Sequence, residues 1–115
     1  VRFLMNEPSQ CCVGRECLFS EGIDVTTSDM HSILDLASGE RINPANDVYI
    51  GSKVWLGKDA LVLKGAHVGE HSVIGAASLV TGTLPGHSLC VGSPARVIRS
   101  GITWRHDLVP AALER

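Results

Sequence analysis

Aliphatic residues recur at every sixth position through the middle of the chain. The positions are Ile50, Leu56, Val62, Val68, Ile74 and Val80. Glycine follows four of these six residues, and alanine or serine lies two places before most of them. An α-helix of about 3.6 residues per turn would spread a period of six around its whole circumference. The pattern therefore excludes a long helix.

A period of six fits a chain of very short strands. Side chains alternate faces in an extended chain, so in Val54-Trp55-Leu56 the two outer residues point inward and Trp55 points outward. A corner at Gly57-Lys58-Asp59 follows, where we expect glycine to adopt backbone angles that other residues avoid. Three strands make one triangular coil, and stacked coils pair their strands in parallel. The sequence predicts an all-β fold, a parallel β-helix.

The same frame continues upstream of the central repeats. It predicts one β-helix domain over residues 1–115, with coils over roughly 7–30 and 44–99. Cys11 and Cys17 then take inward positions and serve as small core residues. The upstream frame positions are Val13, Phe19 and Val25.

Two segments depart from the frame. The stretch "HSILDLASGERINPAND" has no period of six, so residues 31–43 are predicted to form a loop that leaves the coils. Loops on a rigid scaffold are where functional residues concentrate. The C-terminal residues 103–115 are expected to cap the open end of the stack, with a short helix from Asp107 whose first turn tolerates Pro110.

Composition narrows the classes of partner. The chain has 115 residues and a net charge of -2, so no broad basic surface points to nucleic acid or to an acidic membrane. It shows no secretory signal and no apolar run approaching about 18 residues, and it has four cysteines. We therefore expect a reduced, cytoplasmic setting. A single domain of this size buries limited surface alone, so a partner chain would help.

Several motifs carry a resemblance to a known family. The tandem hexads, "VWLG", "VIGAASLVTG" and the closing "GSPARVIR" resemble the hexapeptide-repeat acyltransferases. The likeness is strongest to the maltose and galactoside O-acetyltransferases and to sugar acetyltransferases of polysaccharide synthesis. It covers about residues 13–99. It implies left-handed winding, against the usual right-handed rule for parallel crossovers, and a homotrimer with active sites between subunits.

The resemblance also implies an activity. It predicts transfer of an acetyl group from acetyl-CoA to a hydroxyl or amino group of a sugar or similar small acceptor. The catalytic histidine of the family lies just before the loop, where "TSDMHSI" holds His31. Imidazole titrates near pH 6.5, roughly, so it is a ready general base at neutral pH. Asp29 is favoured over Asp35 to orient it, although either carboxylate could instead shape the loop.

Coenzyme contacts are likewise implied by the resemblance. Trp55 would border the pantetheine arm, and Arg96 and Arg99 would lie near the nucleotide phosphates, which guanidinium groups bind well. The family often has lysine where this chain has Gly82, so phosphate binding is expected to be weaker or differently arranged. The full set of matching positions is Trp55, Lys58, Ala76, Thr81, Gly82, Arg96 and Arg99.

Two other functions stay open at this stage. The first is a zinc enzyme similar to the γ-class carbonic anhydrases, for which His67, His71 and His87 supply the residue type, although the expected spacing is absent. No metal is expected if the acetyltransferase assignment holds. The second is a non-catalytic solenoid that serves assembly or binding. Outward residues such as Leu61 and Val73 are predicted to pack between subunits.

Overall fold

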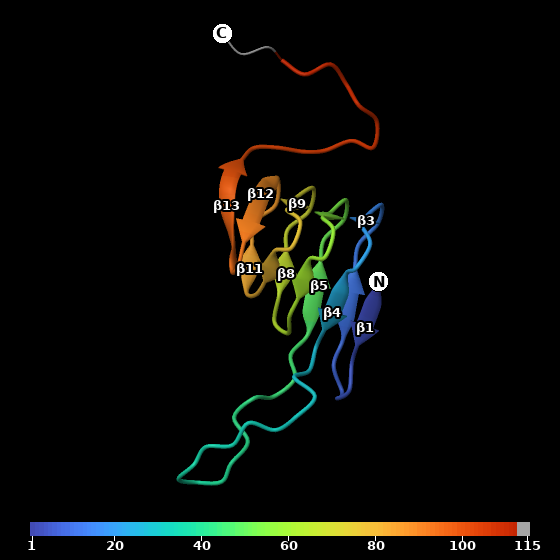
Figure 1. The fold of residues 1–115 in the computed structure, drawn as a ribbon. Helices are drawn as coiled ribbons and strands as arrows, with labels where there is room; N and C mark the ends of the chain where they lie inside the picture. The colour runs from blue at the N-terminus through green and yellow to red at the C-terminus, as the bar shows by residue number, and fades with distance from the viewer. Residues whose placement is uncertain (113–115) are drawn as a thin grey trace.

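The computed structural model describes residues 1–112 as a three-sided stack of short parallel strands (Figure 1). The predicted fold class, an all-β left-handed parallel β-helix, is confirmed. Successive strands fall on three faces, here called A, B and C. Face A holds β1 (Arg2–Leu4), β4 (Asp24–Thr26), β7 (Leu61–Val62) and β10 (Leu79–Val80).

The other two faces follow the same order. Face B holds β2 (Cys11–Val13), β5 (Val48–Ile50), β8 (His67–Val68) and β11 (Thr83–Leu84). Face C holds β3 (Leu18–Phe19), β6 (Trp55–Leu56), β9 (Val73–Ile74), β12 (Ser88–Gly92) and β13 (Ala95–Ser100). All pairs are parallel except β12 with β13, which are antiparallel. We name the three edges of the prism corners A/B, B/C and C/A.

Aliphatic ladders fill the inside of the prism. The register places Leu56 against Ile74 and Val62 against Val80, so equivalent positions of neighbouring coils lie in contact range. All six aliphatic residues of the central frame are fully buried. Cys90 takes the corresponding place in the last coil and is also buried. The inward and outward assignment made from the sequence is confirmed, since Trp55 is 36% exposed between two buried neighbours.

The role expected for the corner glycines is wrong in detail. Gly57 does not have a positive φ, whereas Asp59, two residues later, does (63°). A Cβ added to Gly57 would lie 2.7 Å from the backbone nitrogen of Ala76 in the next coil. Glycine is therefore needed at positions 51, 57 and 69 because backbone atoms of the neighbouring coil pass very close. The left-handed residue at each turn is often not glycine.

The first coil begins earlier than expected and is less well covered. β1 starts at Arg2 and pairs with β4, ahead of residue 7. Val13 occupies a frame position but is 39% exposed, since within residues 1–112 its strand β2 pairs with β5 alone. Cys11 and Cys17 are half-buried and pack against the core.

The C-terminal segment differs from the prediction. The helix expected from Asp107 is wrong for residues 107–112, which have no regular structure, and residues 113–115 lie outside the described part of the chain. β13 covers one face of the last coil by pairing with β12. The chain then turns back along corner B/C instead of capping the open end (Figure 1). Among residues 1–112, no helix is long and apolar enough to cross a membrane.

The close approach of coils predicts a large cost for Gly69→Ala. The added Cβ would lie 2.2 Å from the backbone nitrogen of Gly86, which no side-chain movement relieves. We expect a loss of about 3 kcal/mol in the free energy of unfolding, at the upper end of the cost of overpacking because backbone atoms cannot move aside, measured by urea denaturation. Gly39→Ala is the matched control, since its Cβ meets open space and only its φ of 75° is unfavourable. That control should cost roughly 1 kcal/mol. Equal losses would contradict the steric explanation.

Candidate functional site

The loop predicted from the sequence leaves the prism at corner A/B. It connects β4 on face A with β5 on face B and projects away from the stack (Figure 1). Its two arms meet through the bridge between Leu34 and Arg41, and the backbone N–H of Ile42 donates to the carbonyl of Ile33 (2.8 Å). The loop is therefore an ordered hairpin-like excursion.

Asp35 shapes the tip of this loop. Its carboxylate accepts a hydrogen bond from the backbone N–H of Ser38 (2.8 Å), and its carbonyl accepts one from Gly39 (2.9 Å). The bonds from Ser38 lower the pKa of the Asp35 carboxyl. Of the two roles left open for Asp35, its contacts fit the shaping of the loop.

A clamp of charged side chains ties the loop to the first coil. Arg41 donates two hydrogen bonds to the Glu7 carboxylate, at 2.7 and 2.8 Å. The hydroxyl of Ser28 donates a third, at 2.5 Å. These bonds, first those from Arg41 and then that from Ser28, lower the pKa of Glu7 to about 2. Glu7, on the turn between β1 and β2, thus holds both ends of the excursion.

Asn43 fixes the backbone around His31. Its side-chain amide donates to the carbonyl of His31 (2.8 Å), while its oxygen accepts from the backbone N–H of Ile33 (2.7 Å). Asn43 is 5% exposed, so these bonds are shielded from water. The two bonds hold the peptide units before and after Ser32 in one arrangement.

Asp29 is engaged elsewhere than with the imidazole. Its carboxylate forms an ion pair with Lys64 (2.7 Å) and accepts a hydrogen bond from Asn43 (3.1 Å). Lys64, followed by Asn43, lowers the pKa of Asp29. Lys64 also donates to the carbonyl of Pro44 (2.9 Å). Within residues 1–112 the contacts of Asp29 make it an anchor of the loop and give it no bond to the His31 ring.

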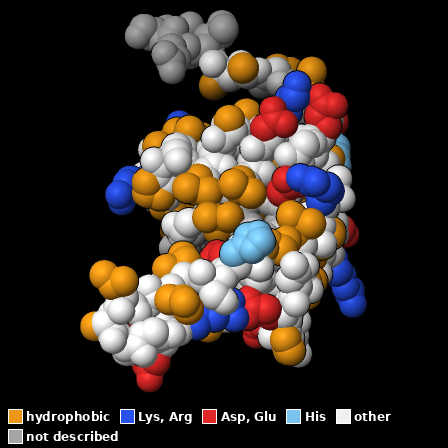
Figure 2. Space-filling model, turned by 60° about the horizontal axis from the view of Figure 1, so that its bottom comes forward, with side chains coloured by type: hydrophobic (Ala, Val, Ile, Leu, Met, Phe, Trp, Pro, Cys, Tyr) orange, Lys and Arg blue, Asp and Glu red, His pale blue; other side chains and the backbone are white. Residues whose placement is uncertain are grey.

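His31 itself is exposed at the root of the loop. Its ring has no hydrogen-bond partner within the described chain, while its backbone is held by Asn43. Figure 2 shows hydrophobic side chains gathered across one face of the molecule, beside charged and histidine side chains. The exposed apolar residues of the loop include Ile33, Leu34, Leu36 and Ile42. An imidazole on a fixed backbone is available to a ligand from outside.

The predicted coenzyme residues lie in three separate places. Lys58 and Ala76 share corner C/A, where the N–H of Ala77 donates to the carbonyl of Lys58 (2.8 Å) and the Lys58 side chain pairs with Glu21. Thr81 and Gly82 lie exposed at corner A/B, the corner that carries the loop. The remaining three residues lie on face C: Trp55 on β6, and Arg96 and Arg99 on β13.

One chain therefore does not bring the whole set together. His31 lies at corner A/B, whereas Trp55 points outward from face C. The indole N–H of Trp55 donates to the Ser20 hydroxyl (3.4 Å), and its ring lies 5.9 Å from that of Trp104. Trp104 was not singled out from the sequence, because it lies beyond the repeats.

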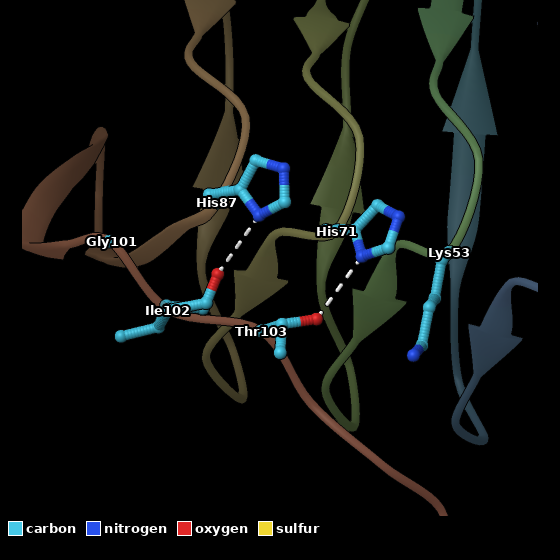
Figure 3. Close-up of a pocket in the computed structure, with 6 residues that line it drawn as sticks. All are labelled: Lys53, His71, His87, Gly101, Ile102 and Thr103. Atoms are coloured by element: carbon cyan, nitrogen blue, oxygen red, sulfur yellow. Dashed lines mark hydrogen bonds between the residues drawn. The ribbon is translucent and has the colours of Figure 1, made fainter.

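The histidines considered for a metal site are divided between two places. His71 and His87 stack at corner B/C with ring centroids 4.8 Å apart (Figure 3), whereas His67 packs against Tyr49 on face B. Residues 1–112 contain no group of three or more histidine, cysteine or carboxylate side chains placed to hold a metal ion.

The clamp predicts an acid-sensitive contribution to stability. The Glu7 pKa is about 2 in the folded chain against an ordinary 4.5, so its carboxylate stabilises the fold above pH 4.5. This contribution is lost as the pH falls from 4.5 towards 2. Glu7→Gln should lower stability at pH 7 and flatten the pH dependence in this window, as measured by urea denaturation. Glu40→Gln, an exposed carboxylate on the same loop, should keep the wild-type profile.

Comparison with known proteins finds hexapeptide-repeat transferases by sequence and by structure. Residues 47–82 match the family model described as bacterial transferase hexapeptide (six repeats). The polysialic acid O-acetyltransferase of Escherichia coli O1:K1 / APEC is 39% identical over 92 residues. The match covers 80% of this chain but only 30% of that protein, so the chain spans less than a third of this relative.

Solved structures share the fold over nearly the whole chain. The polysialic acid O-acetyltransferase OatWY superposes with a TM-score of 0.91 at 29% identity, covering 96% of this chain and 53% of that one. A galactoside acetyltransferase in complex with coenzyme A superposes with a TM-score of 0.62 at 19% identity, covering 96% and 72%. The second likeness is one of fold alone. The chain is thus a hexapeptide-repeat left-handed β-helix that resembles the polysialic acid O-acetyltransferases in both sequence and fold.

Proposed function

We propose that the chain forms the catalytic β-helix of an O-acetyltransferase, which moves an acetyl group from acetyl-CoA to a hydroxyl group of a sugar acceptor. The observation that carries the proposal is the placement of His31. Its imidazole is exposed at the root of an ordered loop, while Asn43 holds its backbone. Similarity to polysialic acid O-acetyltransferases supports the reaction and points to a sugar polymer as acceptor. Cytoplasmic location stays a prediction.

The proposed reaction is a direct transfer. His31 accepts the proton of the acceptor hydroxyl as that oxygen attacks the acetyl carbonyl. The carbon–oxygen bond forms, the carbon–sulfur bond breaks, and the imidazolium returns the proton to the departing thiolate. A backbone N–H would stabilise the oxyanion that develops on the carbonyl oxygen. No covalent intermediate on the enzyme is needed.

Asn43, rather than Asp29, fixes the base in this mechanism. The amide of Asn43 binds the His31 carbonyl, whereas Asp29 is paired with Lys64. Asp29 then acts by holding Asn43 and Lys64 at the root of the loop. A base held through its backbone keeps its ring free to approach an acceptor, which is one form of preorganisation.

We further propose that the coenzyme binds between two chains of a homotrimer. Trp55 on face C would border the pantetheine arm, with Lys58 and Ala76 beside it at corner C/A. Thr81, Gly82 and His31 lie at corner A/B, which within one chain does not border face C. These three residues would therefore come from a neighbouring chain. Arg96 and Arg99 on β13 would pair with the phosphates. The exposed Tyr49 and Leu61 support burial of part of the prism surface.

Removal of the base should abolish most of the activity. We expect His31→Ala to lower kcat for acetyl transfer by about 100-fold or more, because general base catalysis contributes that much or more. Thiol release from acetyl-CoA in the presence of an oligosaccharide acceptor measures the rate. His67→Ala is the matched control, an exposed histidine on β8 away from the loop. Equal rates in His31→Ala and wild type would remove His31 from the mechanism.

Mixed assembly tests whether the site is shared between chains. His31→Ala and Trp55→Ala subunits are each expected to be inactive. After the two variants are unfolded and refolded together in equal amounts, an intact His31 meets an intact Trp55 at about one quarter of the interfaces of a cyclic trimer. Activity should therefore return to about a quarter of the wild-type value. A mixture as inactive as its components would rule out a shared site.

A further inference from the structure

The segment from Gly101 to Trp104, here called the strap, runs along corner B/C with one residue for each coil. The N–H of Ile102 donates to the His87 carbonyl (2.9 Å). Thr103 lies beside His71, with 3.1 Å between Oγ1 and Nδ1. The indole N–H of Trp104 donates to the carbonyl of Lys53 (2.7 Å). Figure 3 shows the strap passing across the ends of these corner residues.

The corner positions are equivalent from coil to coil. Lys53, His71 and His87 all have positive φ, at 53°, 61° and 50°, so the same turn geometry repeats along the corner. Two of them present their carbonyl groups to the strap, and His87 also brings its Nδ1 to within 3.3 Å of the Ile102 carbonyl oxygen. The repeat therefore supplies a regular row of partners for a segment that lies outside the repeat.

The strap does not pack flat against the corner. A groove of about 470 Å³ remains between them, bordered by Lys53, His71, His87 and residues 101–103. The strap is held there by the hydrogen bonds to Lys53, His71 and His87, and Trp104 is its anchor. Trp104 is 6% exposed yet lies outside the aliphatic core cluster of the prism. Trp104 is therefore buried against the outer surface of the prism next to corner B/C, and not in its core.

That surface contains Trp55. The two indole rings lie 5.9 Å apart at an angle of 52°, within the range of favourable aromatic pairs. The Lys53 ammonium also lies 5.7 Å from the Trp104 ring centroid, and the His106 ring packs edge to face with Trp104 at a centroid separation of 4.9 Å. Trp55 contacts Ser20 through its N–H, so Ser20 and Trp104 together restrict its rotamer.

We infer that Trp104 is a positioning residue for coenzyme binding, which acts by fixing the indole of Trp55. The inference rests on the proposed function of Trp55 as the wall beside the pantetheine arm. Trp55 projects from a strand of two residues and is 36% exposed, so nothing in its own strand selects one rotamer. Trp104 supplies that selection from outside the repeats. An aromatic wall held in its bound arrangement loses less side-chain entropy when a ligand binds.

The first experiment tests whether the strap is docked. The chain has two tryptophans, so circular dichroism reports their coupling without labels. The wild-type protein should show an exciton couplet that disappears in Trp104→Phe and in Trp104→Ala. Leu108→Ala, which changes a fully exposed residue beyond the strap, should retain it. Absence of the couplet in the wild-type protein would overturn the inference, because the two rings would not be held together.

The second experiment measures coenzyme A binding by titration calorimetry. An aromatic pair contributes about 0.5 to 1.5 kcal/mol beyond its buried area, which corresponds to a change of roughly 2- to 12-fold in Kd. We expect Trp104→Ala to raise the Kd by that factor, Trp104→Phe to restore most of the affinity, and Leu108→Ala to bind as wild type. In turnover, KM for acetyl-CoA should rise while kcat changes little.

Failure of the inference can be told from failure of the proposed function. If the wild-type protein shows the couplet but does not bind coenzyme A, the proposed function fails and the inference fails with it. If the wild-type protein binds and Trp104→Ala binds equally well, only the role of Trp104 is overturned. A general loss of folding in Trp104→Ala would lower the number of coenzyme A sites per chain in the calorimetric titration while the remaining sites keep the wild-type Kd, and this outcome also contradicts the inference.

Discussion

Parallel backbone pairing between successive coils is the constraint on which the rest of the structure depends. Each strand must meet the equivalent strand of the next coil, so each coil must return to the same three faces. Strands of only two or three residues leave no freedom to slip, because a shift of one residue would turn the buried Leu56 outward and Trp55 inward. The aliphatic ladders and the closely packed glycines follow from this register. The inward positions must stay apolar or small, so other side chains and irregular segments fit only at a corner or on the outer surface of the prism.

The candidate site uses both of these permitted departures. The loop interrupts corner A/B without disturbing the register, since β4 and β5 still pair with their neighbours in neighbouring coils. Its stability comes from polar contacts with residues of three different coils, among them Glu7 and Lys64. The strap uses the outside of corner B/C in a comparable way. The coils thus fix two irregular segments, with His31 on the loop and Trp55 beside the strap.

While the left-handed winding was implied by the family resemblance, the period of six was sufficient to predict a parallel β-helix and the inward and outward residues of its central coils. It could not predict the clamp, because the pairing of Glu7 with Arg41 depends on how a loop of free length closes in space. The same reason explains why Asp29 was assigned to His31 and lies instead against Lys64, a residue distant in sequence. Trp104 was missed since nothing in "ITWRHD" repeats, and the acceptor of its indole N–H is a backbone carbonyl, a group that every sequence has. A local sequence pattern predicts the strands and the buried positions that the repeat imposes. Polar contacts between residues far apart in the sequence can be identified only from the three-dimensional structure.

The position of Glu7 has one more consequence. It lies on the turn between β1 and β2, whereas its partner Arg41 lies in the loop, so a movement of this turn away from the loop would leave Arg41 unpaired with Glu7. Arg41 also donates to Asn43, the residue that holds the backbone of His31, the proposed base. Order at the turn between β1 and β2 is thereby linked to readiness for the proposed chemistry at the loop, and a molecule bound to this turn would influence turnover without touching any substrate.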